Sequence, residues 1–113
     1  MLGSAIETIT CRDLYELSGR QSIELIDVRT AEEFREVRAE GARNVPLDSQ
    51  ELFEMLQRTK QATDPTVYFI CAVGARSAQA CAAFMAAGHL NVVNVEGGTK
   101  AWCYAGLPTL RGE

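Results

Sequence analysis

The stretch Val67-Tyr68-Phe69-Ile70-Cys71-Ala72-Val73-Gly74-Ala75-Arg76-Ser77 contains the features that decide the fold. Its first four residues form an apolar run with β-branched side chains, which is typical of a buried strand. Small residues and a glycine follow, and a long alanine-rich segment then extends from Arg76 to Ala87 and is followed by Gly88. This order predicts a strand, a tight turn and a long helix in succession.

Two other runs have the same apolar character and predict further buried strands, at residues 25–28 and 92–95. Residues 6–9 are the candidate for an additional edge strand. The segments between these runs carry helix-start signatures, in which a capping residue is followed three positions later by an acid: Thr10 with Asp13, Thr30 with Glu33, and Asp48 with Glu51.

Glycines and a proline predict where the helices end. Gly19 follows the first helix, and Gly106 with Pro108 closes a last helix that contains Trp102. Strands that alternate with helices predict an α/β fold with right-handed crossovers. We therefore expect a three-layer α/β/α arrangement, with a mostly parallel sheet of four to five strands and helices on both faces.

The composition predicts one domain over residues 1–113, with enough apolar side chains (47%) to form a core. The net charge is −4 and no basic run occurs, which argues against nucleic acid and anionic membranes as partners. The apolar runs are too short to cross a membrane, and residues 1–4 lack the features of a signal peptide. We expect a cytoplasmic protein.

The four cysteines, at positions 11, 71, 81 and 103, are predicted to be free thiols. The sequence has no Cys-x-x-Cys motif and its single histidine, His89, has no ligand partners at suitable spacing, so no metal or other cofactor is implied. Cys81, Cys11 and Cys103 are interpreted as core residues, because cysteine is among the most buried residue types.

Cys71 differs from the other cysteines in its position at the carboxyl end of a predicted strand, where ligands bind in open parallel sheets. The small residues after it allow several backbone N–H groups to point inward, and the next helix adds about half a positive charge at its N-terminus. Such surroundings favour an anion and lower the pKa of a thiol. Arg76 in the first helical turn has the wrong sign for the helix dipole, which indicates that it holds an anion.

The chain resembles the single-domain rhodaneses, a family of sulfurtransferases. Residues 25–29 with Glu33-Phe34 are similar to the first signature of that family, and residues 71–77 to its Cys-x4-Arg-Ser active-site loop. Residues 96–108 are similar to its closing signature. The resemblance implies that Cys71 accepts a sulfane sulfur as a persulfide and passes it to a nucleophile.

The same resemblance implies that the backbone N–H groups of residues 72 to 76 cradle this persulfide. The donor would be a small anion such as thiosulfate, which Arg76 would orient, and the acceptor a thiol, cyanide or a protein. Ser77 would add a hydroxyl donor. The residues expected to bind substrate are therefore Ala72, Val73, Gly74, Ala75, Arg76 and Ser77.

One segment departs from the family pattern. Many members carry Gly-His-Ile-Pro-Gly-Ala after the first signature, whereas this chain has Val-Arg-Ala-Glu-Gly-Ala at residues 37–42. The shape of residues 37–40 and any role of that histidine do not carry over. Asp27 and Arg29 are interpreted as a structural pair, and Gly97 and Gly98 as a turn that requires positive φ.

Three alternative functions fit the sequence less well. A Cys-His hydrolase needs a base beside the thiol, but His89 lies a 12-residue helix away, or roughly 18 Å. Phosphatases and arsenate reductases have five residues between cysteine and arginine, whereas four separate Cys71 from Arg76. A rhodanese-like binding or adaptor module typically lacks the cysteine. Sulfur transfer needs no protein acid or base, because the leaving group departs as an anion.

Overall fold

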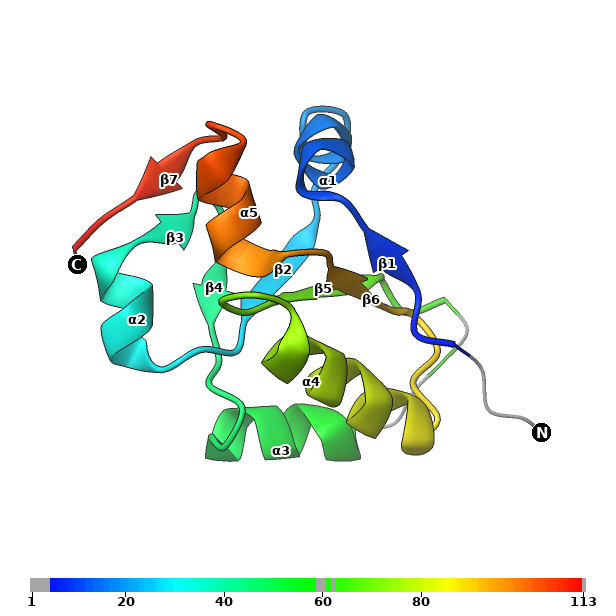
Figure 1. Ribbon diagram of the computed structural model, residues 1–113. Helices are drawn as coiled ribbons and strands as arrows, with labels where there is room; N and C mark the ends of the chain where they lie inside the picture. The colour runs from blue at the N-terminus through cyan, green and yellow to red at the C-terminus, as the bar shows by residue number, and fades with distance from the viewer. Residues whose placement is uncertain (1–4, 59–60, 62, 113) are drawn as a thin grey trace.

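The computed structural model describes residues 5–58, 61 and 63–112 (Figure 1). A parallel sheet of five strands forms its centre, in the order β1-β6-β5-β2-β4. Its strands are β1 (Thr8–Ile9), β2 (Glu24–Asp27), β4 (Arg43–Asn44), β5 (Val67–Ile70) and β6 (Val92–Val95). A separate antiparallel pair is formed by β3 (Arg38–Ala39) and β7 (Thr109–Leu110). The helices are α1 (Cys11–Ser18), α2 (Ala31–Glu36), α3 (Gln50–Gln57), α4 (Ala75–Ala86) and α5 (Gly98–Tyr104).

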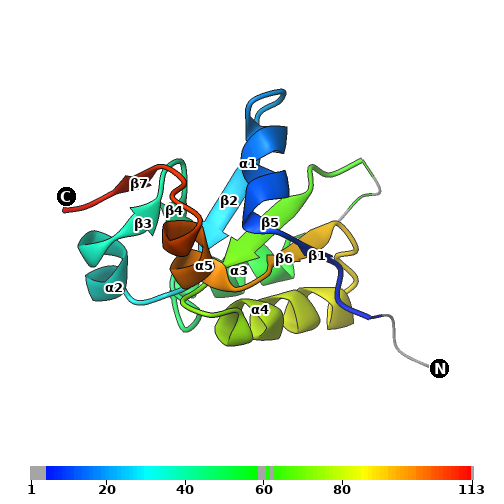
Figure 2. The same ribbon diagram turned by 45° about the horizontal axis from the view of Figure 1, so that its top comes forward.

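The predicted three-layer α/β/α arrangement is confirmed, with α1 and α5 on one face of the sheet and α3 and α4 on the other (Figures 1 and 2). Alternate residues of β5 point to opposite faces because the side chains of a strand have a period of two. Tyr68 and Ile70 belong to the same core cluster as Leu14 of α1 and Trp102 of α5, whereas Phe69 belongs to the core cluster on the α3 and α4 side. The central strands are therefore buried on both faces.

Two of the three predicted helix starts are confirmed. The Thr10 hydroxyl accepts a hydrogen bond from the Asp13 N–H, and Thr30 forms a complete capping box with Glu33. The third start is corrected by one residue: Ser49, not Asp48, caps α3. The Ser49 N–H donates to the Pro46 carbonyl, and this turn places the Ser49 hydroxyl where it accepts from the Leu52 N–H.

The positions of three cysteines confirm or correct the sequence interpretation. Cys11 and Cys81 are buried, as expected. Cys103 is exposed, so its interpretation as a core residue is wrong. Successive helical residues are separated by about 100° around the axis, and Trp102 takes the inward position, which turns Cys103 outward.

The segment that departs from the family pattern contains β3. The guanidinium of Arg38 lies 4.7 Å from the centre of the Phe34 ring and donates to the carbonyl oxygens of Phe34 and Gly112. Strands of two residues, such as β3 and β7, have no sequence signature of their own. They pair because the C-terminal segment runs back beside α2, where the Gly112 N–H donates to the Arg35 carbonyl.

No helix in the described ranges is long and apolar enough to cross a membrane.

The pair between Asp27 and Arg29 fixes the end of β2. The Asp27 carboxylate accepts hydrogen bonds from the backbone N–H, Nε and Nη2 of Arg29, and Nη2 also donates to the Val37 carbonyl at 2.7 Å. Both residues are buried. They form a structural pair, as the sequence predicted.

Arg29→Met is expected to lower the free energy of unfolding by about 3–5 kcal/mol, because it leaves a buried Asp27 carboxylate without its counter-ion. Arg43→Met is the control: Arg43 pairs with Glu24 and Glu51 on the surface, and its loss should cost at most about 1 kcal/mol. Urea unfolding measures both. Equal losses in the two variants would contradict a structural role for the Asp27–Arg29 pair.

Candidate active site

Cys71 lies at the carboxyl end of β5, at the start of a short loop that leads into α4. Its side chain is 1% exposed and belongs to the core cluster on the α3 and α4 side of the sheet. The loop turns at Gly74, which has φ 108°, a conformation that residues with a side chain rarely adopt. This turn directs the Gly74 N–H at the Cys71 sulfur, with 3.1 Å between N and Sγ.

The start of α5 holds the same loop from the other side. The N–H groups of Thr99 and Lys100 donate to the carbonyl oxygens of Cys71 and Ala72, at 2.8 and 3.0 Å. Because each of these carbonyls is engaged by α5, the peptide groups of the loop are fixed in orientation. The cysteine loop is therefore held in place by the start of α5, which lies more than 20 residues further along the chain.

Gly98 allows this close approach. Its φ is 63°, and a Cβ at this position would overlap the Cys71 carbonyl oxygen and lie 2.7 Å from the carbonyl carbon of Ala72. The sequence interpretation of Gly97 and Gly98 as a turn with positive φ is confirmed. The sequence did not indicate that Gly98 also makes close backbone contact with the cysteine loop.

Ser77 and Asn94 complete the surroundings of the sulfur. The Ser77 hydroxyl lies 3.2 Å from Cys71 Sγ and 2.5 Å from Asn94 Oδ1, while Asn94 Nδ2 donates to the Gly74 carbonyl at 3.3 Å. Sequence reasoning missed Asn94. The available signal was a polar residue inside the apolar run at 92–95, since a buried polar side chain needs partners.

The surroundings of Cys71 lower the pKa of its thiol. Burial raises the pKa, but hydrogen bonds from the Ser77 hydroxyl and from the N–H groups of Ser77, Gly74 and Val73 favour the thiolate and outweigh burial. The Ser77 hydroxyl has one proton, and when Cys71 ionises it can turn from Asn94 to the sulfur.

Cys81 provides the contrast. It is fully buried in α4, and burial raises its pKa to about 11. Burial likewise raises the pKa of Cys11. Among these three buried cysteines, the hydrogen-bonded loop thus gives Cys71 alone a lowered thiol pKa.

Arg76 has a partner that the sequence did not identify. Its Nη1 and Nη2 donate to Oε1 and Oε2 of Glu33 in α2, at 2.8 and 2.9 Å. The anion that its position in the first turn of α4 indicated is therefore present in the chain itself. The Arg76 hydrogen bonds lower the pKa of Glu33 to about 2, although burial acts in the opposite direction.

The other loop residues predicted to bind substrate differ in exposure. Val73 is 59% exposed and Ala75 is exposed, whereas Ala72 and Gly74 are partly buried. The N–H groups of Val73 and Gly74 act on the sulfur. The expected contacts of the remaining N–H groups with a bound substrate stay predictions.

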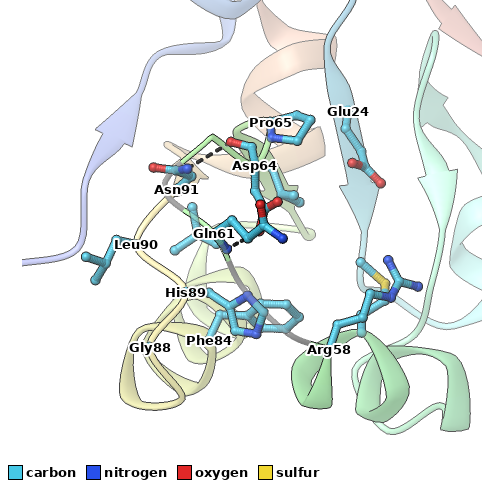
Figure 3. A pocket seen from close by; sticks show the side chains of 13 residues that line it. Glu24, Arg58, Gln61, Asp64, Pro65, Phe84, Gly88, His89, Leu90 and Asn91 are labelled. Carbon is cyan, nitrogen blue, oxygen red and sulfur yellow. Dashed lines mark hydrogen bonds between the residues drawn. The ribbon is translucent and has the colours of Figure 1, made fainter.

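A separate cavity of about 410 Å³ lies at the opposite end of the sheet (Figure 3). It is lined by the first residues of three strands, Glu24, Val67 and Val92, and by His89. The His89 ring packs on Phe84, and its Nε2 lies 2.9 Å from the Leu56 carbonyl oxygen. His89 is therefore remote from Cys71, as expected, and cannot serve as its base.

Comparison with known proteins identifies the family. The family model for the rhodanese-like domain matches residues 10–105 of this chain. A protein named sulfurtransferase from Allochromatium vinosum is 32% identical over 97 residues, which cover 86% of this chain and 87% of that protein. The crystal structure of a rhodanese-related protein from Thermoplasma volcanium superimposes with a TM-score of 0.74 at 33% identity, covering 92% of this chain and 97% of that one. The chain belongs to the family of rhodanese-like domains.

A longer relative contains the same unit as one part. The probable adenylyltransferase/sulfurtransferase MoeZ of Mycobacterium tuberculosis is 38% identical over 96 residues, which cover 84% of this chain. The matched region is 24% of the length of that protein. The similarity thus concerns a domain and leaves most of the longer protein unmatched.

Gly98→Ala is expected to destabilise the fold by about 2 kcal/mol or more and to disturb the cysteine loop, because strain at positive φ is added to a backbone clash. Gly106→Ala is the control: Gly106 has φ 74° but open space around a Cβ, so only the conformational cost of about 1 kcal/mol applies. Urea unfolding gives both losses. Equal losses would show that the contact with the loop contributes nothing.

Ser77→Ala is expected to raise the pKa of Cys71, because it removes a hydrogen bond that favours the thiolate. The pKa is read from the ultraviolet absorbance of the thiolate during a pH titration, with Cys71→Ser subtracted as the blank. In the unmodified chain the Cys71 transition should fall below the ordinary thiol range, and in Ser77→Ala it should move to higher pH. A transition that stays in place or moves down would contradict this role of Ser77.

Proposed function

We propose that this chain is a sulfurtransferase that carries sulfane sulfur as a persulfide on Cys71, from a donor such as thiosulfate to a thiophilic acceptor. The observation that carries the proposal is a thiol enclosed by hydrogen-bond donors at the carboxyl end of the sheet, and these donors lower its pKa. The names of relatives support it, since the Allochromatium vinosum protein is called a sulfurtransferase.

The proposed reaction has two displacements. In the first, the Cys71 thiolate attacks the outer sulfur of thiosulfate, a sulfur–sulfur bond forms at Cys71, and the sulfur–sulfur bond of the donor breaks to release sulfite. In the second, an acceptor thiolate or cyanide attacks the outer sulfur of the persulfide, and the Cys71 thiolate leaves. Neither step requires a protein base, because both leaving groups depart as anions.

The loop supports both steps by stabilising negative charge. The N–H groups of Val73 and Gly74 favour the thiolate before the reaction, and the same donors can hold the terminal sulfur of the persulfide after it. The Ser77 hydroxyl adds a third donor, which rotation can direct at the charged atom. The small anionic donor and the thiol, cyanide or protein acceptor would meet at this loop.

Cys71→Ser is expected to abolish both the addition of one sulfur atom after thiosulfate treatment and the formation of thiocyanate from thiosulfate and cyanide. Intact-protein and peptide mass spectrometry locate the added sulfur. Cys103→Ser is the matched control, because Cys103 is the exposed cysteine and its loss should leave both readouts unchanged. Full activity in Cys71→Ser would refute the proposal, and phosphate-ester hydrolysis that depends on Cys71 would favour the phosphatase alternative.

A further inference from the structure

We propose that Glu33 sets the donor preference of this site: by neutralising Arg76 it disfavours dianionic donors such as thiosulfate relative to organic persulfides, R–S–SH, which carry at most one negative charge on their sulfurs. This inference rests on the proposed function and refines its donor class. It assigns to Glu33 a positioning and specificity role that acts through Arg76.

The geometry of the pair occupies both terminal nitrogens of Arg76. Each nitrogen donates to a different oxygen of Glu33, so the guanidinium is held in a bidentate arrangement. An anion that approaches Cys71 therefore meets a cation whose charge is already balanced. To engage Arg76 fully, the anion has to displace Glu33 or share the guanidinium with it.

Glu33 is itself anchored, so it does not simply swing away. Its Oε1 accepts from the Thr30 N–H at 3.0 Å and from the Thr30 hydroxyl at 3.1 Å, while the Glu33 N–H donates back to that hydroxyl. The capping box thus fixes the carboxylate at the start of α2, facing the start of α4. The carboxylate charge persists at any working pH, since the pKa of Glu33 lies at about 2.

Arg76 follows Cys71 by five positions, and the charges of the two side chains interact. The pKa of Arg76 is raised mainly by its hydrogen bonds to Glu33, and the nearby charge on Cys71 raises it further. The four residues between Cys71 and Arg76 are uncharged, so a donor finds no further cation within the loop sequence. One of them, Val73, offers exposed apolar surface, which suits an organic group better than a hydrated dianion.

The expected selectivity is moderate because the pair is partly exposed. The side chains of Arg76 and Glu33 are 36% and 34% exposed, and solvent screens their interaction. A carboxylate beside the approach path repels a dianion about twice as strongly as a monoanion, since the Coulomb energy scales with the charge product. We therefore expect a shift in the relative rates of the two donor classes, not a complete exclusion of thiosulfate.

The step with an organic persulfide balances as follows. The Cys71 thiolate attacks the outer sulfur of R–S–SH, a bond forms between Cys71 Sγ and that sulfur, and the S–S bond of the donor breaks. The products are the Cys71 persulfide and the thiolate R–S⁻. The outer sulfur keeps its proton, and no oxidant or reductant is consumed.

Glu33→Gln tests the inference, with Glu32→Gln as the matched control. Both variants remove one negative charge from the first turn of α2, but only Glu33 binds Arg76. Formation of the Cys71 persulfide is followed by rapid quench and mass spectrometry, with thiosulfate and with the persulfide of 2-mercaptoethanol as donors. Glu33→Gln should raise the rate constant for thiosulfate on the order of three- to tenfold and change that for the organic persulfide much less. Glu32→Gln should leave the ratio of the two rate constants unchanged.

Arg76→Ala gives an independent check should Glu33→Gln not fold. It exposes the Glu33 charge, so the thiosulfate rate constant should fall more than that for the organic persulfide. In the double variant, which has neither charge, the ratio should return toward that of the unmodified chain. If the ratio is the same in all variants, Glu33 has no role in donor preference. If the unmodified chain takes up no sulfur on Cys71 from either donor, the proposed function itself is wrong.

Discussion

The candidate site depends on the two hydrogen bonds through which the start of α5 engages the carbonyl oxygens of Cys71 and Ala72. A loop of small residues has no stiffness of its own, and its N–H groups could point in many directions. When α5 binds the carbonyls from outside, the peptide planes are fixed and the opposite side of the loop presents N–H groups to the sulfur. Gly98 is the residue that permits this contact, because any side chain there would occupy the space of the loop backbone.

Burial and activation of a thiol act in opposite directions, and this structure reconciles them through hydrogen bonds. Cys71 and Cys81 are both almost completely buried, yet the pKa of Cys81 is raised to about 11 while that of Cys71 is lowered. The difference lies in the donors around Cys71, of which Ser77 is held in place by Asn94. Burial then protects the thiolate from solvent without returning it to the thiol form.

The contact between Arg76 and Glu33 joins two parts of the chain that the sequence signatures leave separate. Glu33 stabilises the start of α2 through its capping box with Thr30, and the same carboxylate neutralises the cation beside the cysteine loop. One side chain therefore serves both local folding and the charge of the site. The net charge beside the cysteine loop therefore depends on α2 as much as on the loop itself.

The sequence by itself determined the order of strands and helices, the place of Cys71 at the end of a strand, and the capping of α1 and α2 by Thr10 and Thr30. These features depend on residues near one another along the chain, where apolar periodicity and capping act locally. Only the tertiary structure decided that Glu33 binds Arg76, that Asn94 holds Ser77 and that Gly98 contacts the cysteine loop. The two residues of each contact lie between 17 and 43 positions apart in the sequence. No local pattern specifies such a pair, because its partners meet only after the sheet has brought the carboxyl ends of its strands together.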